Sequence, residues 1–133
     1  MLKIKVFLWK LYHKGQPLRC TLLRRGLNID PICPIYLGDI ESVEHPFKYC
    51  QIVSMVWEAN DKHHWLPLSV SPTGCKDISQ SLSRIQASHN PKLKQKFLFL
   101  LWRIWKSRNA TIFKNKIFNP LGCLIRAKKA NVE

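Results

Sequence analysis

The sequence predicts a mainly α-helical fold, a small helical domain with an irregular, knuckle-like loop or short hairpin between its second and third helices. Apolar residues recur at steps of three and four along several stretches, which is typical of amphipathic helices. Glycine and proline residues separate these stretches. Hydrophobic residues make up 46% of the 133-residue chain, and five tryptophans and six phenylalanines supply large side chains for a core.

Two helices are expected before the loop. The first covers about residues 3–13, and its broad apolar face includes Val6 and Trp9. The second opens near Pro17, because proline suits the first turn of a helix, and it stops at Gly26.

The stretch of residues 27–49 differs from its neighbours because it is rich in residues that break helices. These residues are Pro31, Pro34, Gly38 and Pro46. A long helix is therefore excluded there, and we expect the irregular loop. A third helix is predicted to start near Cys50 and to run to about Ala59. Residues 61–74 hold two further prolines and several Ser and Thr residues, so we interpret them as a linker or surface loop.

The C-terminal half of the chain is expected to be helical. Asp77 is a predicted N-cap for a short helix. Pro91 then opens the longest helix, to about Phe113, and a weaker helix follows over residues 121–129. The predicted core face of the longest helix contains Leu93, Phe97, Leu101, Ile104 and Trp105. A second apolar face contains Leu98, Phe99 and Trp102, and we expect it to pack on the first helix through Val6, Phe7 and Trp9 or to stay exposed.

These elements suggest three segments along the chain. Residues 1–60 hold the loop and the helices around it, and residues 61–90 hold a linker and a short helix. Residues 91–133 form a basic, amphipathic helical segment.

The charge of the chain indicates a polyanionic partner. Lys and Arg number 22 and Asp and Glu number 8, which gives a net charge of +14. A field of this sign attracts nucleic acid, and we expect RNA or single-stranded DNA. Cations beside aromatic residues can hold phosphates while the rings stack on bases. The candidate residues for this role are Arg24, Arg25, Trp102, Arg103, Lys106 and Arg108. Trp105 is expected in the core. For Trp102, a position in the core and a position on a nucleic-acid-binding surface both stay open.

The cysteines indicate a reducing compartment. Their number is five, and an odd number without a secretory signal argues against a disulfide framework. The longest apolar runs are too short to span a bilayer. We therefore expect an intracellular protein of the nucleus or cytoplasm, neither secreted nor bound to a membrane.

One group of residues has the spacing of a metal site. Cys33 is followed by His45 and then, five positions later, by Cys50. Structural zinc takes four such ligands at the corners of a tetrahedron, often two of them from a Cys-x-x-Cys turn. Here the second position of that turn is Tyr36, and a neutral phenol is a poor zinc ligand. The alternative is two buried thiols and a surface histidine without a metal.

These residues resemble the reverse-transcriptase zinc-binding domain of plant LINE-type, non-LTR retrotransposon polyproteins. Several blocks agree in order: KIKVFLWKL (3–11), LRRG (23–26), CPI (33–35), ESVEHPF (41–47) with Cys50, VW (56–57) and LWRIWKSRN (101–109). The last block resembles the link to a following RNase H-like domain. The resemblance implies a zinc knuckle with a cysteine where this chain has Tyr36. The chain thus resembles a fragment of such a polyprotein with a degenerate knuckle, and we expect zinc to bind weakly or not at all.

The sequence does not indicate an enzyme. Paired aspartates for a two-metal polymerase site are missing, and no activated nucleophile can be named. We expect a non-catalytic module that binds nucleic acid and no small-molecule substrate, with a reverse transcriptase or an RNase H-like domain as a further partner. The alternative is a structural or interaction remnant without independent activity.

Overall fold

The computed structural model describes residues 2–12, 18–30, 32–35, 41 and 45–132, and it confirms the mainly helical fold. No strand occurs within these residues. The elements in chain order are α1 (Leu2–Tyr12), α2 (Arg19–Arg24), the π-helix η1 (His45–Tyr49), α3 (Gln51–His63), the 3-10 helix η2 (Pro72–Gly74), α4 (Ile78–Ser88), α5 (Pro91–Lys114) and α6 (Pro120–Val132). Part of the predicted loop, residues 31, 36–40 and 42–44, lies outside the described residues, so the form of the loop as a whole stays a prediction.

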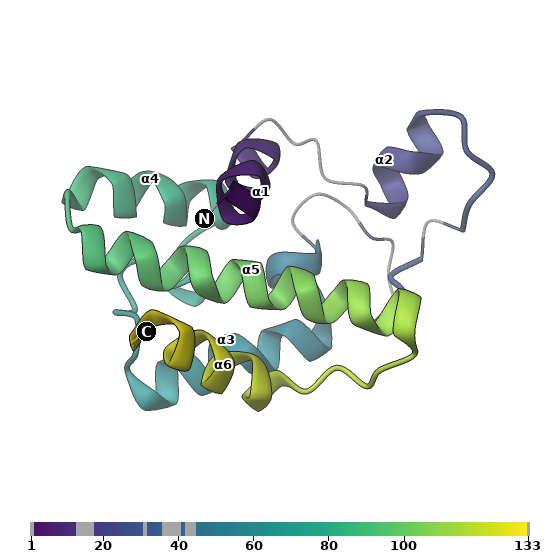
Figure 1. Ribbon diagram of the computed structural model, residues 1–133. Coiled ribbons are helices and arrows are strands. Elements are labelled where there is room, and N and C mark those ends of the chain that lie inside the picture. Colours follow the sequence, from purple (N-terminus) through teal and green to yellow (C-terminus); the bar gives the residue numbers. More distant parts are fainter. Residues whose placement is uncertain (1, 13–17, 31, 36–40, 42–44, 133) are drawn as a thin grey trace.

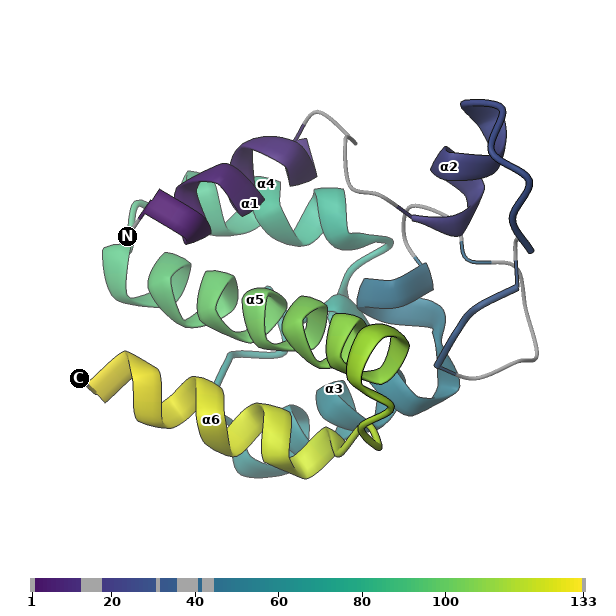
Figure 2. The ribbon, with the colours of Figure 1, turned by 45° about the vertical axis from the view of Figure 1, so that its right-hand side comes forward.

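The long helix α5 runs through the middle of the molecule. Helices α1 and α4 lie on one side of it, and α3 and α6 lie on the other (Figure 1). The same order is visible after rotation, and α2 then stands at the periphery (Figure 2). Helices α1, α4 and α6 thus pack on α5, and α3 packs on α6 and η1.

The predicted helix starts of the C-terminal half are confirmed. The Asp77 carboxylate accepts a hydrogen bond of 2.7 Å from the Gln80 N–H and caps α4. The Asn90 side chain caps α5 by accepting from the N–H groups of Lys92 and Leu93, directly before Pro91. Both caps satisfy N–H groups that the first helical turn leaves without an internal partner.

The core is a single cluster of buried side chains that α5 dominates. Its residues Phe97, Leu101 and Ile104 are fully buried, as the periodicity predicts. The Trp57 indole N–H of α3 donates to the Phe47 carbonyl over 2.7 Å, so η1 and α3 are held together within the core. Phe47 in turn stacks on Trp105, with ring centroids 6.0 Å apart. The predicted core position of Trp105 is thus confirmed.

The apolar face predicted for the first helix is wrong in part. Among the described side chains of α1, Phe7 enters the core, at 3% exposure, whereas Val6 and Trp9 are 44% and 62% exposed. Phe7 makes edge-on contacts with Phe47 and Trp102, at centroid distances of 6.0 and 5.3 Å. Phe7 therefore anchors α1 to the aromatic residues of the core.

Residues 61–74 differ from the predicted linker. Helix α3 continues to His63, and the following turn buries Leu66 and Val70. The Asn60 side chain accepts a hydrogen bond of 2.9 Å from the Leu66 N–H, which folds the turn back onto α3. The buried cluster contains residues from all three segments that the sequence suggested.

No helix among the described residues is long and apolar enough to cross a membrane.

A buried ion pair joins the loop to the long helix. Glu41 is fully buried, and its two carboxylate oxygens accept from Nε and an Nη of Arg108 over 2.7 and 2.5 Å. The same carboxylate accepts from the Arg19 N–H at the start of α2, over 2.8 Å. The Arg108 guanidinium lies 4.7 Å from the centre of the Trp105 ring. Glu41 thus ties α2 and the loop to α5.

Candidate functional site

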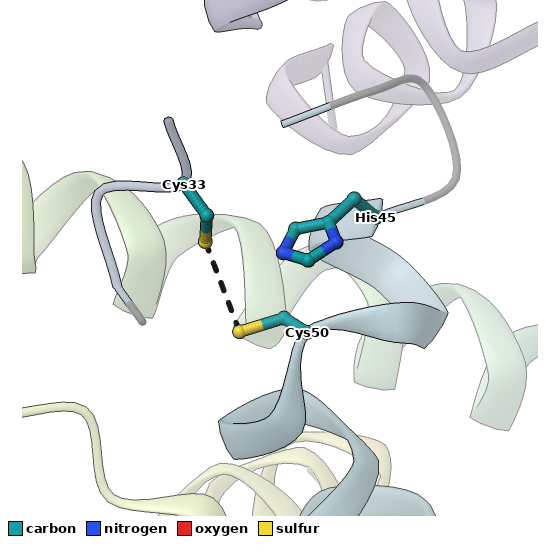
Figure 3. A group of neighbouring side chains, drawn as sticks. All are labelled: Cys33, His45 and Cys50. Atoms are coloured by element: carbon teal, nitrogen blue, oxygen red, sulfur yellow. Dashed lines mark hydrogen bonds between the residues drawn. The ribbon is translucent and has the colours of Figure 1, made fainter. Parts of the chain in front are cut away.

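The three predicted metal ligands meet in one place. The side chains of Cys33, His45 and Cys50 point toward a common centre from the loop, from η1 and from the residue before α3 (Figure 3). All three are buried, with exposures of 0%, 5% and 0%. Among the described residues this is the group of potential ligands that clusters tightly enough for a metal ion.

The π-helical turn explains the spacing of two of these ligands. The Cys50 N–H donates to the His45 carbonyl over 2.9 Å, which is the five-residue hydrogen bond of a π-helix. This bond brings residues five apart to one side of the turn. Phe47, between them, points into the core at 1% exposure and fixes the turn there. The backbone alone therefore holds His45 beside Cys50.

The distances fit a tetrahedral metal ion. The Cys33 and Cys50 Sγ atoms are 3.8 Å apart, and all three ligand atoms lie within 4.8 Å of one another. Two sulfurs bound to zinc at about 2.3 Å with a tetrahedral angle are separated by about 3.8 Å. A disulfide would instead require about 2.05 Å. The separation of the two sulfurs is thus compatible with a zinc-bridged pair and excludes a disulfide.

The environment keeps Cys50 protonated when no cation is present. The hydrogen bond with the Cys33 thiol, and then burial, raise the pKa of the Cys50 thiol far above its usual range. Burial disfavours a thiolate because its charge is removed from water. A bound cation reverses this, because the metal stabilises the thiolate directly. The site is therefore suited to a cation and poorly suited to act as a free nucleophile.

A fourth protein ligand is not evident in the described part of the chain. Tyr36, which takes the fourth position of the knuckle pattern, lies outside the described residues. Cys20 lies on α2, and its Sγ is near the Thr21 hydroxyl at 3.9 Å. His63 ends α3, and a helix of this length places it about 18 Å from Cys50. Neither belongs to the cluster of potential ligands.

The residues predicted to bind nucleic acid are spread over three environments. Arg24 and Arg25 are exposed at the end of α2. On α5, Lys106 is exposed, and Trp102 and Arg103 are half-buried. Lys106 Nζ lies 5.8 Å from the centre of the Trp102 ring.

Arg108 differs from the prediction that it contacts nucleic acid. It is only 3% exposed, and Glu41 neutralises its charge. It is a structural residue because its guanidinium fills a buried site between the loop and α5. The sequence could not reveal this, since the two partners are 67 positions apart.

The sequence also left several exposed cations near α5 unassigned. Lys3, Lys114, Lys116 and Arg126 line one cleft together with Arg103 and Lys106. Lys114 follows Arg103 and Lys106 at steps of a helical face, which is a signal in the sequence. The contributions of α1 and α6 depend on tertiary packing and have no such signal.

The comparison with protein families supports the predicted resemblance. The model of a family described as zinc-binding in reverse transcriptase matches residues 1–57. This stretch contains Cys33, His45 and Cys50, and it ends within α3 at Trp57. No curated protein and no solved structure matches the chain. Residues 1–57, which contain the site, are therefore similar to a zinc-binding module of reverse transcriptases.

Proposed function

We propose that the protein is a non-catalytic module of the reverse-transcriptase zinc-binding type that holds zinc and binds nucleic acid. The observation that carries the proposal is the buried cluster of two thiols and one imidazole at zinc-compatible separations, within the family-matched stretch. Cys33 and Cys50 would supply two thiolates and His45 a ring nitrogen. The metal would supply a crosslink between the loop and the start of α3, as structural zinc does.

The first prediction concerns zinc and stability. Zinc at 100 times its dissociation constant should raise the free energy of unfolding by about 2.7 kcal/mol, because only the folded chain brings the ligands together. Binding must displace the thiol protons. The apparent affinity should therefore rise between about pH 6 and 8, by roughly tenfold per unit for each proton released. Denaturant unfolding at several zinc concentrations, with a phosphine reductant, measures both effects.

Two serine variants provide the comparison. Cys33→Ser should abolish the stabilisation by zinc, whereas Cys20→Ser should keep it because Cys20 is outside the cluster. Zinc-independent unfolding of the natural protein, or full zinc stabilisation of Cys33→Ser, would contradict the proposed site.

The second prediction concerns nucleic acid. The support is the net charge of +14, which favours a polyanion. Binding to RNA or single-stranded DNA should be weak and should fall steeply with salt, since counterion release drives it. Little sequence preference is expected. A fluorescence-anisotropy titration from 20 to 200 mM salt checks this; binding that does not change with salt, or no binding at low salt, would count against it.

The finer parts of the proposal follow from the resemblance. They are an origin in plant LINE-type retrotransposons and a reverse transcriptase or RNase H-like domain as a neighbour. A nuclear or cytoplasmic location is proposed from the cysteine content. The alternative is a structural remnant without independent activity. Exposed apolar side chains such as Trp9, Leu121 and Ile125 favour this alternative, and absence of nucleic-acid binding at low salt would support it.

A further inference from the structure

A basic cleft lies outside the family-matched stretch for most of its length. It has a volume of about 550 Å³ and follows one side of α5, between α1 and α6. Figure 2 shows α5 between α1 and α6. Its lining includes six cations and no acidic residue: Lys3, Arg103, Lys106, Lys114, Lys116 and Arg126. Residues 78–132 contain no Asp or Glu at all, so this charge has little local compensation.

The cations of the cleft act on one another. The pKa of Lys106 is lowered first by partial burial and then by the positive charges of Arg103, Lys3, Lys114 and Arg126. Groups of like charge that are held together without a carboxylate repel each other. A bound polyanion would relieve this repulsion, and the cleft therefore has the electrostatics of a phosphate-binding surface.

The cleft also contains exposed apolar side chains that are not packed in the core. Phe113, near the end of α5, is 78% exposed, and Ile117 is 94% exposed. Trp102 lies on the same wall, half-buried against Phe7. Exposed aromatic rings between cations are typical of surfaces that stack bases while cations hold phosphates. In a duplex the base faces are covered by their neighbours, so only an unpaired strand could use these rings.

We propose that the cleft between α1, α5 and α6 binds single-stranded nucleic acid, with phosphates on its cations and a base stacked on Phe113. This inference rests on the proposed nucleic-acid binding and places it at a definite site. From Trp102 to Lys114 the helix rises about 18 Å, which matches roughly five stacked nucleotides at 3.4 Å each. Arg24 and Arg25, on the peripheral α2, are not part of this site.

Two triple variants of equal charge test the location. Lys106→Gln/Lys114→Gln/Arg126→Gln removes three cations of the cleft. Lys62→Gln/Lys76→Gln/Lys92→Gln removes three exposed cations elsewhere. The probe is a fluorescent ten-nucleotide oligo(dT), with oligo(U) as the RNA arm. The cleft variant should bind at least about tenfold more weakly at 50 mM salt and lose about two units of salt slope, at about 0.7 per phosphate contact. The control variant should bind within about twofold of the natural protein at the same salt.

Phe113→Ala separates base stacking from charge. It should weaken oligonucleotide binding by roughly 5- to 100-fold, and leave binding to inorganic polyphosphate and to anionic phosphatidylserine vesicles unchanged. Because Phe113 is largely exposed, the circular dichroism and unfolding curve should not change. Three results would overturn the proposed binding site in the cleft. They are equal losses of oligonucleotide affinity in the two triple variants, an unchanged affinity in Phe113→Ala, and binding to vesicles as tight as binding to the oligonucleotide. If the natural protein binds no oligonucleotide at low salt, the proposed function fails together with it.

Discussion

Replacing Tyr36 by cysteine should raise the affinity for zinc by roughly 100-fold or more, because a four-ligand site contributes about 10–16 kcal/mol shared among its ligands. Cys33, His45 and Cys50 are already assembled and buried, so the added thiolate would complete a shell instead of creating one. Tyr36 follows Cys33 at the spacing of a Cys-x-x-Cys turn. Competition with a chromophoric chelator at fixed pH measures the change.

Tyr36→Phe is the matched control for this variant. It keeps the ring and removes the hydroxyl, so the zinc affinity should stay within about twofold if the phenol is not a ligand. A tenfold loss in Tyr36→Phe would mean that the phenol oxygen coordinates the metal. An unchanged zinc affinity in Tyr36→Cys would mean that residue 36 cannot reach the fourth coordination position of the metal.

Breaking the Glu41–Arg108 pair should lower the free energy of unfolding by about 3–5 kcal/mol, because the remaining charge stays buried without its partner. Glu41→Gln preserves the shape of the side chain while removing its charge. Small domains have only about 5–15 kcal/mol of stability, so the loss would be a large fraction of the total. Urea unfolding at a constant zinc concentration gives the difference.

Glu58→Gln is the control, since Glu58 is exposed on α3 and its loss should cost less than about 0.5 kcal/mol. Replacing both partners, as in Glu41→Leu/Arg108→Met, should recover most of the stability because no buried charge then remains. If Glu41→Gln and Glu58→Gln unfold at the same urea concentration, the ion pair does not hold the loop to α5.

Local signals in the sequence predicted much of the helical framework. Asp77 and Pro91 carry their information within one helical turn, and the structure has the predicted helix starts at these residues. The fully buried Phe97 and Leu101 follow from periodicity alone. These features could be predicted because capping and amphipathicity depend on residues three or four apart.

Features that depend on distant residues could not be predicted. Phe7 faces the core of the fold because aromatic residues of η1 and α5 surround it, and no pattern within α1 selects it over Trp9. The residues after α3 looked like a linker because prolines interrupt them, yet Leu66 is buried by the tertiary fold. Arg108 looked like its neighbours on α5, and only the position of Glu41 distinguishes it.

The metal cluster could be predicted from the sequence in part. The spacing of Cys33, His45 and Cys50 named the ligands, and the π-helical hydrogen bond from Cys50 to His45 gives the physical reason for the five-residue step. The approach of Cys33 to this turn, over a separation of 17 residues, depends on the tertiary fold. The sequence thus identified the candidate metal ligands, and the tertiary fold brings them together.

X-ray absorption at the zinc edge tests the central claim most directly, because it counts the atoms bound to the metal. The zinc-loaded natural protein should show two sulfurs at about 2.3 Å and two nitrogen or oxygen atoms at about 2.0–2.2 Å. The Tyr36→Cys variant should show three sulfurs and one nitrogen. A shell of oxygen and nitrogen atoms alone in the natural protein, or the same two sulfurs after Cys33→Ser, would contradict a zinc site built on Cys33, His45 and Cys50.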